Sequence, residues 1–237
     1  MVREVRMTED MQRFLEPTRF LDSESEAVTA FSQRACGELR SGVARAVSLY
    51  YVVRDEIRYD PYHIFLVEDG YVASSVLAQG YGFCVSKSIL LAASARAQGI
   101  PSRLGYANVR NHLTTERLKR VMKTDVFVFH GYTELYLDGT WVKATPVFNL
   151  SLCERFGVRP LEFDGRHDSI FHEYDARGNR HMEYLHDYGQ FDDLPFQLMV
   201  SEFKRHYPHM YGEEGVSVNG DFCAEAEAER VRLGPSG

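Results

Sequence analysis

The chain has 237 residues, of which 44% are hydrophobic and 26% are charged, and its formal net charge is −7. This composition is typical of folded globular proteins and excludes disordered and collagen-like classes. The negative charge argues against nucleic acid as a partner. No apolar run approaches the ~20 residues that span a bilayer, and the charged residues 1–10 are not typical of a signal peptide. We therefore expect a cytoplasmic protein with no membrane partner.

Residues 27–57 predict helices, because apolar side chains recur at intervals of three and four. Gly42 marks a junction between two of them, and Pro61 ends the pattern because proline cannot donate a backbone hydrogen bond. A loop is expected next. Residues 74–83 contain paired small residues and two glycines, and this composition predicts a tight turn.

A buried helix is predicted from Cys84 to Ala97. Its apolar residues cover most sides of the helix rather than a single stripe, which is typical of a helix inside a core. Gly99 and Pro101 follow, and this combination commonly stops a helix. Cys84 therefore stands at the helix N-terminus.

The period of the sequence changes to two at residues 126–137, which predicts a strand. Asp138-Gly139 is the strongest signal for a two-residue hairpin turn, and residues 140–145 form the returning strand. This register places Tyr132 opposite Thr145. Beyond that point Pro146 lacks the N–H that pairing needs, so we expect the ladder to loosen there.

Helices followed by a buried helix and a β-hairpin predict an α+β fold. The chain after Pro146 is rich in loops and aromatic residues, with one helical candidate at 195–206. We expect residues 1–211 to form a single domain. Residues 212–237, with alternating Ala and Glu, are interpreted as a mobile tail or a lone solvated helix.

Four cysteines occur without a C-x-x-C pair, and only Cys84 has a context that suggests chemistry. A thiol reacts as the thiolate, which the N–H groups and the positive dipole end of a helix N-terminus stabilise. The N–H of Cys84 can also point at a developing oxyanion. On position alone, a buried and inert cysteine remains an equal alternative.

A nucleophilic cysteine needs a base, and His130 in the predicted strand is the candidate. A histidine base in turn needs a group that fixes its tautomer. On the hairpin register Thr145 lies diagonal to His130 on the same face, and Asn149 would lie diagonal on its other side. The loosened pairing at Pro146 leaves the place of Asn149 open.

These residues resemble the transglutaminase-like superfamily. The resemblance rests on Gly82-Phe83-Cys84, on the helix leading to Gly99-Ile100-Pro101, on the run from His130 to Val142, and on residues 51–60 upstream. Together they span about residues 45–149 in the family's order. The resemblance implies a papain-like core, in which the helix that bears the cysteine packs on an antiparallel β-sheet.

The resemblance further implies that Cys84 is the nucleophile and His130 the base. The family's usual third residue is an aspartate just before a proline, and this sequence has Thr145 there. A hydroxyl can accept from an imidazole but carries no negative charge. Asn149 is our preferred substitute, ahead of Thr145, and Asp164 or another later carboxylate is a further alternative.

The sequence therefore predicts a cysteine-dependent acyl-transfer enzyme that attacks peptide or amide bonds through a thioester. Hydrolysis is favoured over transfer to an amine, because no amine-binding feature is visible. A catalytically impaired binding or scaffold module is the alternative, suggested by Thr145. We expect no cofactor and no metal, since the histidine spacings after His167 do not place two ligands on one helix face.

Overall fold

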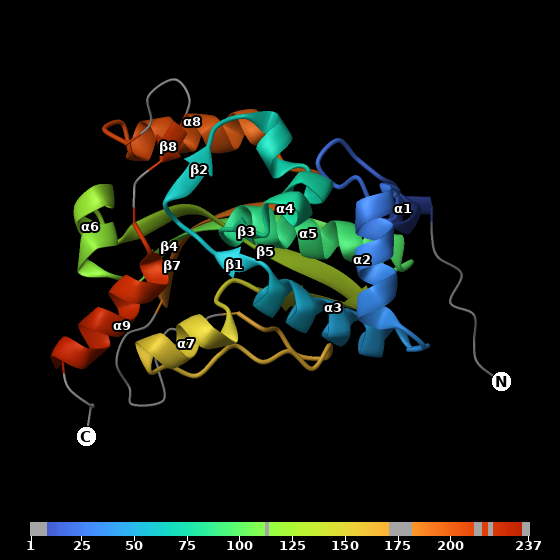
Figure 1. The fold of residues 1–237 in the computed structure, drawn as a ribbon. Helices are drawn as coiled ribbons and strands as arrows, with labels where there is room; N and C mark the ends of the chain where they lie inside the picture. Colours follow the sequence, from blue (N-terminus) through green and yellow to red (C-terminus); the bar gives the residue numbers. More distant parts are fainter. Residues whose placement is uncertain (1–8, 112–113, 171–181, 211–214, 218–219, 234–237) are drawn as a thin grey trace.

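A four-stranded antiparallel sheet, in the order β6-β5-β4-β7, is the framework of the computed structural model (Figure 1). The structure describes residues 9–111, 114–170, 182–210, 215–217 and 220–233. The strands of this sheet are β4 (Ser102–Asn111), β5 (Val126–Leu137), β6 (Thr140–Ala144) and β7 (Met182–Phe191). Two small sheets accompany it, a parallel pair of β1 (Arg58–Tyr59) with β3 (Tyr81–Gly82) and an antiparallel pair of β2 (His63–Phe65) with β8 (Gly215–Ser217).

The helices lie mainly on one side of the sheet and at its ends (Figure 1). In chain order they are α1 (Glu9–Gln12), α2 (Glu26–Cys36), α3 (Gly42–Glu56), the 3-10 helix η1 (Glu68–Tyr71), α4 (Ala73–Gln79), α5 (Cys84–Ala97), α6 (Glu116–Met122), α7 (Leu150–Phe156), α8 (Phe196–His206) and α9 (Phe222–Leu233).

Helix α5 is the centre of the molecule. One side of it packs on β4 and β5, and its other sides contact α2, α3 and α4. Every residue from Cys84 to Arg96 is buried, as the even spread of its apolar residues predicts. The predicted α+β fold, with the cysteine-bearing helix on an antiparallel sheet, is confirmed.

The predicted hairpin is also confirmed. Asp138 and Gly139 have φ values of 49° and 90°, the left-handed conformation that a two-residue turn of type I′ requires. Thr133 pairs with Ala144, and this is the register expected from the turn. Strand β6 ends at Ala144, two residues before Pro146, so the pairing stops where the missing N–H predicts.

Several elements were not predicted from the sequence, and α4, β4 and β7 are three of them. Residues 73–79 form helix α4 where a tight turn was expected, and Gly80 ends this helix in the left-handed conformation. Strand β4 gave no alternating signal because it is buried on both faces. Strand β7 lies at the sheet edge with few buried side chains, so its sequence did not stand out among the predicted loops.

The expected mobile tail is wrong for its described part. Helix α9 packs against α7, and Phe222 is buried against the rings of Tyr59 and Phe156, with centroid distances of 5.5 and 5.6 Å. Glu225 pairs with Arg117 at 3.0 Å. The Ala-Glu alternation concealed this contact, because Phe222 lies before the alternation begins.

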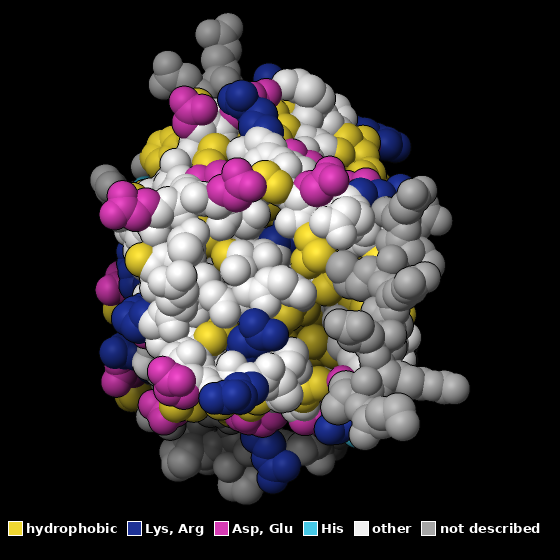
Figure 2. Space-filling view, turned by 90° about the vertical axis from the view of Figure 1, so that its right-hand side faces the viewer, with side chains coloured by type: hydrophobic (Ala, Val, Ile, Leu, Met, Phe, Trp, Pro, Cys, Tyr) yellow, Lys and Arg dark blue, Asp and Glu magenta, His cyan; other side chains and the backbone are white. Residues whose placement is uncertain are grey.

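The surface mixes charges of both signs. Figure 2 shows basic, acidic and hydrophobic side chains together on the face beside α1 and α2. No helix in the described part of the chain is long and apolar enough to cross a membrane. The absence of a nucleic-acid partner stays a prediction.

The packing of α9 can be tested with Phe222→Ala. Phe222 is 3% exposed, so removing its ring should lower the free energy of unfolding by about 3 kcal/mol. Val231→Ala on the same helix is the control, because Val231 is 73% exposed and its truncation should change stability by less than ~0.5 kcal/mol. Equal effects of the two substitutions in urea unfolding would show that α9 does not pack.

Candidate active site

The chain reaches Cys84 through a constrained junction. Strand β3 pairs with β1 and leads directly into α5, whose first residue is Cys84. A Cβ on Gly82 would lie 2.3 Å from Ser86 Oγ, so only glycine fits there. Ser86 Oγ accepts the Phe83 N–H at 3.0 Å. The glycine thus serves the packing of the first helical turn.

The sulfur of Cys84 lies at strand β5, beside His130. The backbone N–H groups of Gly131, Val85 and Cys84 are close enough to the sulfur to stabilise its anion. A Cβ on Gly131 would lie 3.1 Å from the Cys84 carbonyl oxygen, so the strand touches the helix start. The nitrogen of Gly131 is two covalent bonds from the Cα of His130. The fold therefore brings the sulfur of Cys84 against the backbone of the residue that follows His130.

A β-bulge immediately precedes His130. Ala107 pairs with His130 and Val109 pairs with Phe127, so one residue of β4 opposes two of β5. Phe129 has a φ of 60°, a conformation that costs energy in an aromatic residue. Its N–H donates to Asn108 Oδ1 at 2.9 Å. The bulge re-aims the strand at the position of the candidate base.

Two aromatic residues brace this bulge. The ring of Tyr106 stacks on Phe129 with centroids 4.3 Å apart. The hydroxyl of Tyr207 accepts the N–H of Val128 and donates to the carbonyl of Val126, both at 2.7 Å. The backbone groups that the bulge removes from the ladder are therefore satisfied by side chains.

Burial dominates the electrostatics of both candidates. Burial raises the pKa of the Cys84 thiol to about 11, although the three nearby N–H groups lower it. Burial also lowers the pKa of His130 to about 4. The lowered thiol pKa suggested by the helix N-terminus is thus not what the structure shows, because the loss of hydration outweighs the dipole and the N–H groups. At neutral pH the pair consists of a neutral thiol and a neutral imidazole.

Thr145 follows the last residue of β6 and is 1% exposed. Its carbonyl oxygen accepts the Tyr50 hydroxyl at 3.3 Å and the Val147 N–H at 2.9 Å. Its own hydroxyl has no hydrogen-bond partner among the described residues. A buried hydroxyl left in this state is available to an imidazole or to a water molecule.

The side chain of Asn149 is fully engaged elsewhere. Its Oδ1 accepts the Tyr59 N–H at 2.7 Å, and its Nδ2 donates to the carbonyls of Arg54 and Ile57. Asn149 therefore ties the end of α3 to β1. The preferred sequence interpretation placed it beside His130, and these bonds use its amide for structure instead.

The other candidates lie in ordinary structural positions. Asp164 is hydrogen-bonded to the imidazole of His167 and also accepts the N–H groups of His167 and Arg166, and these bonds hold the pKa of its exposed carboxyl well below the usual value. Elsewhere on the sheet, Arg103 pairs with Glu134 at 2.6 Å.

Among the described residues, no three side chains of His, Cys, Asp or Glu lie close enough together to hold a metal ion. Of the histidine-rich segment considered for a metal, His172 and His181 lie outside the described part. The four cysteines are free thiols; Cys223 is partly exposed and the others are buried.

Sequence reasoning missed two residues that shape the site, Gly131 and Asn108. A small residue directly after a candidate base is a usable signal, because a helix start must approach the strand there. Asn108 gave a weaker signal, a polar side chain inside the buried strand β4. Its function depends on the bulge, which no local pattern announces.

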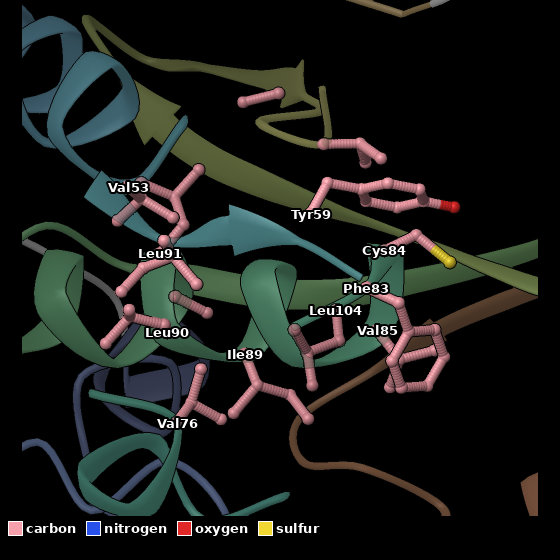
Figure 3. Close-up of a cluster of buried hydrophobic side chains, with 14 of the residues drawn as sticks. Val53, Tyr59, Val76, Phe83, Cys84, Val85, Ile89, Leu90, Leu91 and Leu104 are labelled. Carbon is pink, nitrogen blue, oxygen red and sulfur yellow. The ribbon is translucent and has the colours of Figure 1, made fainter. Parts of the chain in front are cut away.

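Figure 3 shows the immediate surroundings of the thiol, with Tyr59 lying alongside Cys84 and Phe83 and Val85 beneath. All of these neighbours belong to the hydrophobic core. The side chains of Cys84 and Tyr59 point the same way in this view, away from the body of α5. The thiol thus stands at the edge of the core and not in open solvent, with 7% of Cys84 exposed.

Residues 29–146 match the family model described as the transglutaminase-like superfamily. Among solved structures, a protein described as a putative cysteine protease from Cytophaga hutchinsonii is 15% identical over 81% of this chain, with a TM-score of 0.48. Another, described as a putative protease from Parabacteroides distasonis, is 16% identical over 61% of this chain, with a TM-score of 0.38.

The matched regions cover 57% and 31% of the chains of these two solved structures. No curated protein matches this chain.

The structural role of Asn149 can be tested with Asn149→Ala. The substitution leaves the buried N–H of Tyr59 without its acceptor, so the free energy of unfolding should fall by about 2 kcal/mol or more. The pH profile of Cys84 alkylation should keep its shape, since Asn149 does not act on the pair. Leu150→Ala, at a residue 42% exposed, is the control. A changed pH profile of alkylation with unchanged stability would show instead that Asn149 acts on the pair of Cys84 and His130.

Buried His130 should make stability depend on pH. Its pKa falls from 6.5 to about 4 on folding, so the unfolded chain binds the proton more tightly between these values. The contribution to stability is complete above pH ~6.5 and is lost as the pH falls through about 4. Between pH 7 and pH 4, the wild type should lose about 3 kcal/mol more than His130→Gln.

Chemical unfolding at a series of pH values measures this difference. The control is His209→Gln, at an exposed histidine, which should follow the wild-type curve. Parallel curves for the wild type and His130→Gln would contradict the neutral buried imidazole.

Proposed function

This chain belongs to the transglutaminase-like superfamily, whose model it matches over residues 29–146, and we propose that it is a cysteine-dependent hydrolase of peptide or amide bonds. One observation carries the proposal. The Cys84 sulfur lies at the first turn of α5, against the peptide group that joins His130 to Gly131. A nucleophile, a base and backbone donors at one point are what acyl transfer requires.

The chemistry starts from neutral partners. As the sulfur attacks the substrate carbonyl, His130 takes the thiol proton, and the C=O π electrons move to oxygen. The N–H groups of Gly131 and Cys84 lie near the sulfur, where they can donate to this oxyanion. The imidazolium then gives its proton to the leaving amine as the C–N bond breaks, which leaves a thioester on Cys84.

Water completes the cycle. His130 takes a proton from water as the oxygen attacks the thioester, and the proton returns to the sulfur when the acid product leaves. An added amine can replace water in this step and give a new amide. We favour water, because it is abundant and needs no binding site of its own.

Thr145 is the residue we propose as the orienting group for His130. Its buried hydroxyl has no hydrogen-bond partner among the described residues, whereas the amide of Asn149 is fully used. A hydroxyl can accept from the imidazole N–H but does not stabilise an imidazolium by charge. We therefore expect slower proton transfer than an aspartate would support.

A binding module without catalysis is the second candidate, and one observation favours it. The pKa of Cys84 is raised to about 11 and that of His130 is lowered to about 4, so the resting pair carries no charge. In such a module the family's fold would hold a ligand at the start of α5, beside Cys84, and the thiol would be inert.

Alkylation of Cys84 separates the two candidates. If the protein is an enzyme, the rate at which iodoacetamide labels Cys84 should rise near pH 4, because His130 becomes neutral there and can act as a base. Above that pH the rate should stay level. A second rise toward pH 11 follows the thiolate. His130→Ala should remove the level part and keep the second rise.

Peptide mapping by mass assigns each label, and Cys84→Ala gives the background. Cys223 is an internal control, because this partly exposed thiol should show a single rise that His130→Ala does not change. A screen of peptide and amide substrates, read as a thioester adduct by intact mass, tests the acyl step. A single rise at Cys84 with no thioester from any substrate would overturn the enzyme and support the module.

A further inference from the structure

A cavity opens beside the candidate nucleophile and has Cys84 in its wall. Its walls come from five separate parts of the chain: the β1–β2 region, the start of α5, α6, β5 and the end of α8. It contains about 460 Å³ of empty space including its open mouth, and the part wide enough to accept water is about 40 Å³. It is therefore a narrow crevice, and Cys84 forms part of its wall.

The described lining of this crevice is apolar. Ile64, Met122, Val128 and Phe203 are among its side chains, and no charged residue lines it within the described part of the chain. Tyr207 also contributes, but its hydroxyl is bound to the backbone of β5, so it offers its ring. Such a lining stabilises a buried apolar group, and it makes the dehydration of a charged group costly.

The position of His130 shows which part of a substrate the crevice would accept. Cys84 lines the crevice and His130 does not. The leaving amine must lie on the imidazole side, because the imidazolium protonates it. The group attached to the attacked carbonyl then extends the other way, into the crevice.

We propose that this crevice is the specificity site for the acyl side of the substrate, and that it binds an uncharged aliphatic side chain. The inference rests on the proposed function and adds a substrate class to it. The apolar lining favours an aliphatic group such as leucine over charged groups. Selectivity of this kind is about tenfold to a few hundredfold in apolar pockets.

Peptide amides that differ only in the residue bearing the attacked carbonyl test this. With leucine there, the wild type should form its Cys84 thioester at least ~10 times faster than with aspartate or lysine. Met122→Glu, at a lining residue that is 6% exposed, should reduce the rate for leucine by a similar factor and increase the rate for lysine. Rates are read by intact mass.

Three variants control the experiment. Met122→Leu keeps the lining apolar and should retain the wild-type preference. Leu198→Glu adds the same charge on α8 at a residue outside the described lining and should also retain it. Met210→Glu changes a different wall of the crevice and replaces Met122→Glu if that variant does not fold, as judged by thermal unfolding and by His130-dependent alkylation.

The outcomes separate the two proposals. Thioester formation at equal rates for leucine, aspartate and lysine, unchanged in the glutamate variants, would overturn the specificity site and leave the hydrolase standing. No thioester from any peptide, together with alkylation that does not depend on His130, would overturn both. A leucine preference that Met122→Glu inverts toward lysine would establish the crevice as the acyl-side site.

Discussion

A buried polar junction at the end of α3 holds the candidate site in place. The carbonyl oxygens of Arg54 and Ile57 each accept two side-chain donors, Lys87 Nζ from α5 and Asn149 Nδ2 from the start of α7. Burial lowers the pKa of Lys87 well below its usual value. Strand β1 begins directly after this junction and pairs with β3, which leads into Cys84. The hydrogen bonds of Lys87 anchor α5 to this junction, and Lys87 lies one helical turn after Cys84. They therefore help to set the position of the nucleophile.

The same enclosure that fixes the geometry also sets the acidity of the pair. A helix N-terminus favours a thiolate by its dipole and N–H groups, but Cys84 is too deeply buried for these to offset the loss of hydration. Burial also disfavours the charged form of His130, and for an imidazole this lowers the pKa. Reactivity in such a site depends on direct proton transfer from thiol to imidazole as the substrate arrives, because a resting ion pair is costly in an apolar crevice.

The features of the fold and of the candidate site that the sequence predicts are those set by interactions between residues close together in the chain. The start of α5, the turn at Asp138-Gly139 and the hairpin register follow from local patterns, and the structure confirms them. The place of Asn149 does not follow, because the chain leaves the ladder after Ala144 and the side chain finds the end of α3 instead. The packing of Phe222 and the bulge before His130 are likewise set by distant partners, which a single sequence does not display.

The bulge links local strain to the candidate chemistry. Phe129 adopts a φ of 60°, which an aromatic residue avoids unless its surroundings impose it. Here the surroundings are Asn108, which accepts the Phe129 N–H, and Tyr106, which stacks on its ring. A regular strand would need neither partner, so both side chains stabilise an irregularity whose next residue is His130. The strained bulge therefore lies directly before the candidate base, and the Cys84 sulfur meets the same strand at the peptide bond between His130 and Gly131.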